Sequence, residues 1–289
     1  GILMLVMLFQ NISRGMASWK RVRQILDADQ MQDGEFEKST PIKGDIEFRN
    51  ASFGYPGSDK RVLEGVNLHI HPGETVAIMG TTGCGKSTLI SLIPRFYDAS
   101  EGEVLVDGVD VREYRQRALR DRIAIAMQKS ELFSVSIAEN ILWGDPEASG
   151  ERIEKAASVA QADCFIREME AGYGSIVAER GMSLSGGQKQ RVSLARAVIK
   201  DAEILILDDA TSALDLKTEA ELYKALDASK PDCTKIIVAQ RIASARRADR
   251  IVILDNGRIA ASGSHEELLC TCPLYKEIAR SQMGEEALA

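Results

Sequence analysis

Several features that would identify a class of protein are missing from the sequence. Only five of its 289 residues are cysteines, and the one close pair, Cys270 and Cys272, has no second pair to match it. This pattern excludes a disulfide scaffold and a spaced zinc site of cysteines. We therefore expect a reducing compartment, in which these two residues are packing or surface thiols.

An excess of positive charge is also missing. Lys and Arg number 36 against 43 Asp and Glu, which gives a net charge of −7. This balance argues against general binding to nucleic acid phosphates, so no nucleic acid partner is expected.

The N-terminal segment contains eight consecutive apolar residues, Ile2–Phe9, followed by a polar and basic stretch from Arg14 to Arg23. The run is too short for a membrane span, which needs ~20 apolar residues, and it lacks the basic start and cleavage site of a signal peptide. Two interpretations stay open. The segment is either a buried N-terminal helix or the last turns of a transmembrane helix with its cytoplasmic flank.

The next part of the chain changes character three times. Residues 27–44 are polar and acidic without apolar periodicity, and we interpret them as a linker. Residues 45–74 alternate short β-forming runs with turn signals, which predicts an antiparallel β subdomain. The apolar run Thr75–Met79 predicts a buried strand that leads through a glycine-rich turn into a helix over residues 86–93.

Helical patterns dominate residues 129–192. For example, Ile153, Ala157, Ala160 and Cys164 recur at the spacing of one helix face. We therefore expect a helical subdomain here.

Short apolar or β-branched runs return later, separated by helical segments, at residues 204–207, 235–239 and 251–254. This alternation predicts a mainly parallel sheet with crossover helices. The predicted fold is α/β, with an antiparallel β subdomain and an inserted α-helical subdomain.

A phosphate-binding motif follows the predicted strand at residues 75–79. Residues 80–88 read Gly-Thr-Thr-Gly-Cys-Gly-Lys-Ser-Thr, which matches G-x-x-x-x-G-K-[ST] and predicts the core of a P-loop NTPase. Glycines let the backbone curl and aim N–H groups at phosphate oxygens. We expect a nucleoside triphosphate and Mg²⁺ as ligands, with Lys86 on the phosphates and Ser87 on the metal. The expected nucleotide contacts in this loop are Thr82, Gly83, Cys84, Gly85, Lys86, Ser87 and Thr88.

Two acidic residues, Asp208 and Asp209, follow the apolar run at residues 204–207. Parallel α/β sheets place ligands at the carboxyl ends of their strands, so Asp208 is suited to hold Mg²⁺ through water. Asp-Asp after a strand is weak evidence alone, because acidic residues often begin loops. Its coincidence with the P-loop gives it weight.

Residues 184–188 read Leu-Ser-Gly-Gly-Gln and precede a helix-forming stretch. Ser185 can cap that helix, and Gly186 and Gly187 leave N–H groups exposed, which suits a second phosphate grip completed by Gln188. Here the sequence resembles the signature motif of the ATP-binding cassette (ABC) family. The resemblance covers about residues 45 to 280.

The resemblance implies roles for further residues. Tyr55 is similar to the aromatic residue that stacks on adenine, with Val62 packing nearby. Residues 179–181, Glu-Arg-Gly, resemble the short loop that precedes the signature in exporters, and residues 212–215, Ser-Ala-Leu-Asp, resemble the D-loop at the cassette dimer interface.

Gln128 resembles the Q-loop glutamine. In the family this residue touches the metal region and couples it to the membrane domain. The implied metal set is therefore Ser87, Gln128 and Asp208.

Two positions depart from the family pattern. The family usually has Glu where this chain has Asp209, and His where this chain has Gln240; the only histidines, His69, His71 and His265, are not at suitable places. Asp is one methylene shorter than Glu, and an amide cannot become cationic as an imidazole can. We therefore expect the site to bind ATP well and hydrolyse it poorly, although neutral drift in a working enzyme is an alternative.

In this family two cassettes meet head to tail, so each ATP lies between one P-loop and the partner's signature. The predicted function is the ATPase subunit of a heterodimeric ABC exporter, with an impaired site of its own and an intact signature for its partner. The alternatives are a soluble ABC ATPase of DNA repair or translation and a fully active homodimeric transporter ATPase.

The resemblance also decides how the termini are interpreted. Residues 1–26 are expected to be the end of the last transmembrane helix and its cytoplasmic extension, since exporters fuse their membrane domain before the cassette. Residues 45–283 would form the nucleotide-binding domain, with residues 284–289 as a tail. The cassette would then lie at the cytoplasmic face of the cell membrane.

Overall fold

The computed structural model describes residues 1–27, 31–37, 42–58, 60–178, 181 and 183–283, and it divides the chain into two compact units, Gly1–Asp33 and Gly34–Ala289. The first unit is the helix α1 (Ile2–Leu26), none of whose residues is buried. The interpretation as a buried helix is therefore wrong. Within the described residues, no helix combines the length and the apolar character needed to cross a membrane.

The second unit is built on a six-stranded sheet with the order β10-β9-β3-β8-β7-β6. Five neighbouring strands are parallel, and β10 pairs with β9 in the antiparallel direction at one edge. The strands are β3 (Thr75–Met79), β6 (Ile123–Ala126), β7 (Ile204–Asp208), β8 (Thr234–Val238), β9 (Arg250–Asp255) and β10 (Arg258–Gly263).

Both faces of this sheet are buried, which explains why its strands are continuous apolar runs in the sequence. Alternate residues of β3 enter two different cores: Ala77 and Met79 join one apolar cluster, and Val76 and Ile78 join the other. The predicted α/β fold with a mainly parallel sheet is confirmed.

A second, antiparallel sheet has the order β2-β1-β4-β5, which confirms the predicted β subdomain. Its strands are β1 (Ile46–Phe53), β2 (Leu63–Ile70), β4 (Glu101–Val106) and β5 (Val109–Asp110). The last two follow the P-loop helix α2 (Lys86–Leu92) in sequence, so this sheet is larger than the sequence indicated. The short helix α3 (Gln116–Asp121) leads from it to β6.

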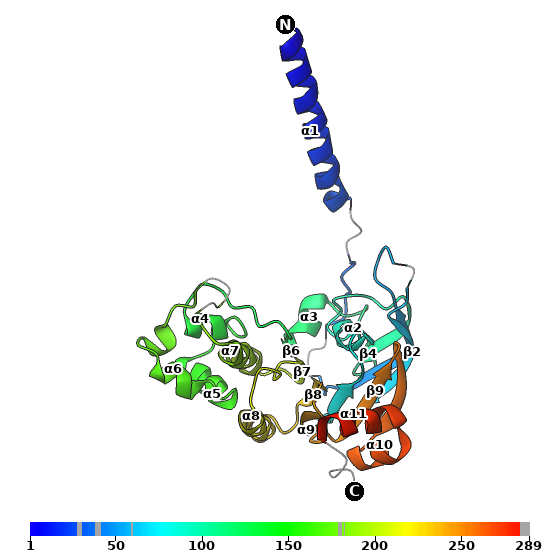
Figure 1. Cartoon of the computed structure of the whole chain (residues 1–289), viewed down its shortest axis with the longest axis vertical. Helices are drawn as coiled ribbons and strands as arrows, with labels where there is room; N and C mark the ends of the chain where they lie inside the picture. Colours follow the sequence, from blue (N-terminus) through cyan, green and yellow to red (C-terminus); the bar gives the residue numbers. More distant parts are fainter. Residues whose placement is uncertain (28–30, 38–41, 59, 179–180, 182, 284–289) are drawn as a thin grey trace. The chain divides into compact units, whose positions relative to one another are not determined.

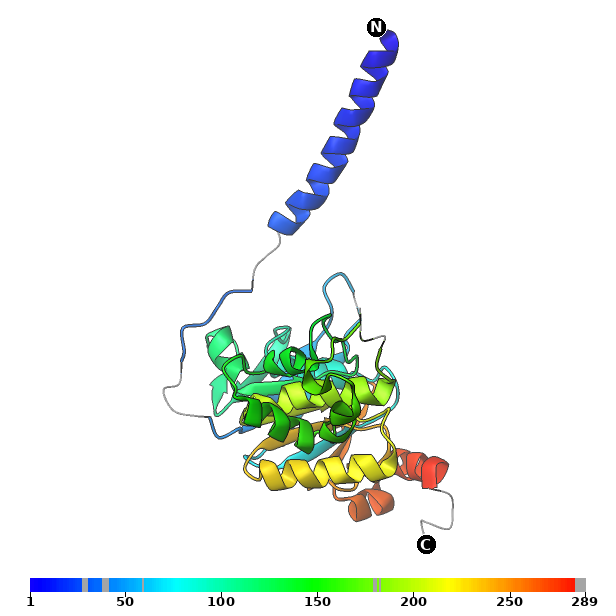
Figure 2. The ribbon, with the colours of Figure 1, turned by 90° about the vertical axis from the view of Figure 1, so that its left-hand side faces the viewer.

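The helical subdomain contains α4 (Ile137–Leu142), α5 (Gly150–Val159), α6 (Asp163–Glu168) and α7 (Gly186–Ile199), which lie together beside the six-stranded sheet (Figures 1 and 2).

One detail of the predicted helical pattern is wrong. The face from Ile153 to Cys164 is not one helix, because α5 ends at Val159 and Gln161 adopts a positive φ of 58°. Cys164 is exposed and lies in the first turn of the next helix, α6, which begins at Asp163.

The remaining helices are α8 (Leu216–Ser229), α9 (Ile242–Ala245), α10 (His265–Thr271) and α11 (Pro273–Met283). Helix α11 contacts α9, and this contact brings the end of the described chain next to the carboxyl end of β8. The tail expected at residues 284–289 lies outside the described residues.

Part of the segment interpreted as a linker belongs to the second unit. Its backbone pairs with the segment after β5: Phe36 N–H donates to Glu113 O at 2.9 Å, and Arg115 N–H donates to Phe36 O at 2.9 Å. The Phe36 ring also packs edge-on against the buried Tyr114, with the ring centroids 5.0 Å apart. The folded unit therefore begins at Gly34 rather than at Asp45.

Candidate nucleotide site

The candidate site lies at the carboxyl ends of four adjacent strands. In the order β3-β8-β7-β6, the P-loop follows β3, Gln240 follows β8, Asp208 ends β7 with Asp209 next to it in sequence, and Gln128 follows β6. Because parallel strands present their carboxyl ends at one edge of a sheet, residues as far apart in the sequence as Lys86 and Gln240 meet there.

The P-loop is held open by its glycines. Gly80 has φ 149°, and a Cβ there would lie 2.0 Å from Leu254 O, so no other residue fits without moving the backbone of β9. Gly83 has φ 80° and faces open space, and Gly85 starts α2 with φ 105°. These are backbone conformations that residues with a Cβ rarely adopt.

The Lys86 ammonium group folds back onto this loop. Its Nζ donates to Gly80 O at 2.9 Å and to Thr81 O at 2.8 Å. The cation is therefore placed over the loop, where phosphate oxygens would compete for it. Cys84 is buried, with its Sγ 3.8 Å from the same Nζ.

A cavity of about 380 Å³ opens beside the loop, within the range of roughly 300–1,000 Å³ typical of small-molecule sites. It brings together most of the sequence-predicted residues. Its lining comprises Tyr55, Val62, Thr82, Gly83, Gly85, Lys86, Ser87, Thr88, Gln128, Asp208, Asp209, Val238 and Gln240.

Tyr55 stands at the rim of this cavity and is 38% exposed. Its hydroxyl lies 3.0 Å from Thr88 Oγ1, and its ring meets Phe53 and Tyr97 edge-on. An accessible aromatic ring therefore stands beside the phosphate loop, which is the placement that base stacking needs.

Ser87 and Asp208 lie side by side in the lining of the cavity. Ser87 Oγ donates to Asp208 Oδ1 at 3.1 Å, and Asp208 is buried. Burial raises the pKa of this carboxyl group, and the bond from Ser87 offsets part of the effect. A hydroxyl and a carboxylate are the oxygen ligands that Mg²⁺ prefers, so these two residues fit a magnesium ion.

Asp209 is constrained by its burial, its backbone conformation and its hydrogen bonds. It is buried and has a φ of 50°, which is uncommon for a residue with a Cβ. Its Oδ2 accepts hydrogen bonds from Gln240 Nε2 at 2.7 Å and from Gln128 Nε2 at 3.2 Å. Burial raises its pKa, the Gln128 bond lowers it, and the neighbouring Asp208 charge raises it further.

Three residues that the sequence analysis missed support Asp209 and Gln240. Gln190, on α7, donates from Nε2 to Ser212 Oγ at 3.0 Å, and Ser212 Oγ donates to Asp209 O at 3.0 Å. Arg241 binds Ser212 O at 2.9 Å.

Gln282, on α11, is the third missed residue. It donates to Gln240 O at 2.7 Å and accepts from Ile242 N–H at 2.8 Å, so its side chain binds the backbone on both sides of Arg241. Nothing in the local sequence identifies Gln282, because its partners lie about 40 residues earlier.

The signature segment Ser185–Gln188 contributes nothing to the cavity lining in the part of the chain that the structure describes. Ser185 caps α7 in a reciprocal arrangement: Gln188 N–H donates to Ser185 Oγ at 3.3 Å, and Ser185 N–H donates to Gln188 Oε1 at 2.9 Å. Gly186 is exposed and Gly187 partly so. The exporter-type loop at residues 179–181 lies largely outside the described residues.

Comparison with known proteins decides the family. Residues 63–212 match the family described as "ABC transporter", which is more than half of the chain. The chain belongs to the ABC transporter family.

Among curated members of the ABC family, the chain is 44% identical over 273 residues to an ATP-dependent lipid A-core flippase of Pectobacterium atrosepticum, and 43% identical to those of Yersinia pestis and Escherichia coli K12. These alignments cover 94% of this chain and 47% of each relative. The chain therefore spans about half the length of these relatives.

A solved structure of a bacterial Atm1-family ABC exporter with ATP bound is also similar, with a TM-score of 0.87 and 36% identity. The match covers 98% of this chain and 50% of that one. The described fold is therefore that of an ABC exporter cassette.

The first prediction concerns Asp208. Because burial raises its pKa, the folded chain holds this proton more tightly than the unfolded chain, so the charged group costs stability once pH exceeds the folded pKa. We expect Asp208→Asn to stabilise the nucleotide-free chain at pH 8 by about 1 kcal/mol, a few degrees in melting temperature. The gain should shrink as the pH falls through the raised pKa of Asp208, because the wild-type carboxyl group then takes up its proton in the folded chain.

Asp110→Asn is the matched control for that experiment. Asp110 is also buried, but its carboxylate accepts bonds from Arg112 at 2.9 and 2.6 Å, so neutralising it should lower the melting temperature. A loss of stability in Asp208→Asn at pH 8 would contradict the burial cost assigned to this group.

The second prediction concerns Gln282. Gln282→Ala removes two side-chain bonds to the backbone around Gln240, each with a net contribution of about 1 kcal/mol. We expect faster hydrogen exchange of the Ile242 amide and a lower melting temperature. Gln282→Glu retains the acceptor for Ile242 N–H and should preserve its protection; equal exchange in all three proteins would show that Gln282 does not hold this segment.

Proposed function

We propose that this chain is the ATP-binding cassette of an ABC exporter, that it binds Mg·ATP in the cavity beside the P-loop, and that its own site hydrolyses ATP slowly. The family and the exporter-like fold support the general assignment. The observation that supports slow hydrolysis is that both Gln240 and Gln128 donate to the same oxygen of Asp209.

Binding and hydrolysis depend on different residues of this cavity. Lys86 stands over the loop glycines, where it would contact phosphates, and Ser87 and Asp208 would hold the metal. Bound Mg²⁺ would neutralise phosphate charge and hold the phosphates in place. These features support the proposal that the cavity binds Mg·ATP.

Hydrolysis also requires a general base, and Asp209 is the residue expected in that role. A general base must come within about 2.6–3.2 Å of the proton it accepts, or reach it through one water. Asp209 has a short side chain, and its Oδ2 is engaged by two amide donors. An amide at position 240 donates a hydrogen bond, but it cannot carry a proton to or from the phosphate as an imidazole can.

The placement of the signature supports a partner cassette. In the described part of the chain, Ser185–Gln188 is absent from the lining of the cavity, while Gly186 presents its backbone at the surface. In the proposed assembly this segment completes the site of a second half-transporter, and the partner's signature closes this one. A heterodimer would explain this combination. The P-loop of this chain would lie in an impaired site, and its intact signature would complete the active site of the partner.

A membrane domain completes the proposal. The matched relatives are about twice as long as this chain, and α1 begins with exposed apolar residues and continues into a basic stretch. We take α1 as the cytoplasmic end of a final transmembrane helix, which places the cassette at the cytoplasmic face of the membrane. The relatives include a lipid A-core flippase and an Atm1-family ABC exporter, and we propose for this chain the ATP-driven export that the two have in common.

Two other functions make different predictions. A soluble ABC ATPase of DNA repair or translation would act without a membrane domain, whereas the relatives are exporters and flippases. A fully active homodimer is the nearer rival, because it uses the same fold and the same cavity. It differs in requiring that Asp209 and Gln240 support turnover.

The third prediction separates the heterodimer from the homodimer in the assembled, full-length transporter. Ser185→Arg places a large cation where the opposite γ-phosphate must dock, whereas Asp209→Asn removes a carboxylate that is already engaged. We expect Ser185→Arg to abolish most steady-state ATPase activity and Asp209→Asn to leave most of it. Equal losses from the two substitutions would support an active homodimer and contradict the division of labour proposed here.

A further inference from the structure

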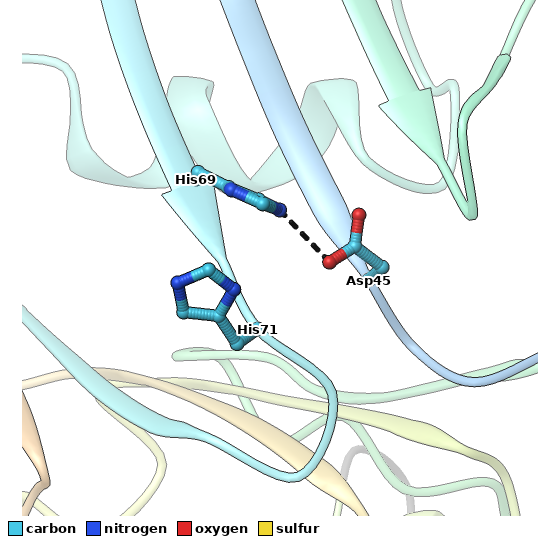
Figure 3. Close-up of side chains that lie close together, drawn as sticks. All are labelled: Asp45, His69 and His71. Atoms are coloured by element: carbon cyan, nitrogen blue, oxygen red, sulfur yellow. Dashed lines mark hydrogen bonds and ion pairs between the residues drawn. The ribbon is translucent and has the colours of Figure 1, made fainter.

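Two histidines and an aspartate meet on the exposed face of the antiparallel sheet, away from the nucleotide cavity (Figure 3). His69 lies in β2, and His71 directly follows its last residue, Ile70; Figure 3 shows the two imidazole rings side by side. Leu68 and Ile70 point to the opposite, buried face.

The third member of the cluster comes from the neighbouring strand. Ile46 pairs with Ile70, and Asp45 immediately precedes Ile46, so Asp45 stands across from the end of β2. The pairing of β1 with β2 therefore fixes this residue opposite the two histidines.

The side chains already lie close together. His69 Nε2 is 2.8 Å from Asp45 Oδ1, and the centroids of the two imidazole rings are 4.3 Å apart. One potential ligand atom from each of the three residues lies within 4.8 Å of the others. Figure 3 shows the three side chains on the same side of the two strands.

We propose that Asp45, His69 and His71 bind a divalent transition-metal ion of the Zn²⁺ class. Imidazole nitrogen and carboxylate oxygen are zinc ligands with bond lengths of about 2.0–2.2 Å, and three protein ligands leave a fourth position for water. Tetrahedral ligands at that distance stand roughly 3.3 Å apart. The side chains are 45% exposed at His69 and 29% at Asp45, so small side-chain rotations can close the remaining gap.

The backbone beneath the cluster is held by its neighbours. Glu74 Oε2 accepts from His71 N–H at 2.8 Å, and the Arg250 guanidinium donates to His69 O. Asp45 N–H donates to Asp107 Oδ1 at 3.0 Å. These bonds reduce the ordering that binding requires, which favours affinity.

A bound ion would tie the start of β1 to the end of β2. It would therefore stabilise the antiparallel sheet at the point where the chain enters it, directly after residues 42–44. None of the three ligands lines the nucleotide cavity within the described residues, so the inference stands independently of ATP binding.

The fourth prediction tests the site by calorimetric titration of the 289-residue chain with Zn²⁺, in a Cys164→Ser, Cys270→Ser background that removes the exposed thiols. We expect one ion per chain and a higher melting temperature with Zn²⁺, because a ligand that binds only the folded state stabilises it. His69→Ala and His71→Ala should each weaken binding at least tenfold. His71→Asp retains a ligand atom and should bind more tightly than His71→Ala.

His265→Gln is the matched control, because His265 is the only other histidine and its Nδ1 contacts the Tyr275 hydroxyl at 2.7 Å. Its Zn²⁺ affinity should equal that of the background protein. Absence of one-to-one binding would reduce the cluster to a surface hydrogen bond and overturn the proposal. Equal affinity in the background protein and in the His69 and His71 variants would overturn it as well.

Discussion

The parallel pairing of β3, β8, β7 and β6 is the constraint on which the nucleotide site depends. Each strand contributes one functional segment from its carboxyl end, and the pairing register sets their relative heights. A slip of one residue in any pair would turn the side chains of that strand to the opposite face. The apolar cores on both sides of the sheet prevent this slip, so the packing of the core also determines the geometry of the site.

Asp209 follows one of these paired strands, β7, and its conformation depends on the surrounding fold. Its positive φ and its burial are both unfavourable, and they are maintained by a chain of hydrogen bonds that runs through Ser212 to Gln190. Gln190 lies on α7, the helix that begins with the signature segment. Hydrogen bonds therefore connect Asp209 with the helix that carries the signature segment, and in the assembly proposed above this connection would couple the two nucleotide sites.

The sequence predicts a structural feature correctly where that feature depends on residues close together in the chain. The P-loop glycines, the buried strands and the Ser185 cap each lie within a few residues of their partners or follow one period, and all were predictable. Gln282 and the pairing of Phe36 with Glu113 and Arg115 were not, because they join segments that only tertiary packing brings together. The break after Val159 was missed because Ala160 and Cys164 continue the helical spacing although the backbone does not.

The most direct test of this account is single-turnover ATP hydrolysis, measured together with Mg·ATP affinity, for the four combinations of Asp209→Glu and Gln240→His. The assay uses a transporter whose other site is disabled, with Lys86→Ala as the variant that lacks the phosphate anchor. We predict similar affinities in all four proteins, slow hydrolysis in the wild type and in each single variant, and partial recovery only in the double variant, because the two residues act as one unit. Turnover of several per second at the unaltered site, or full recovery from Asp209→Glu alone, would contradict the account.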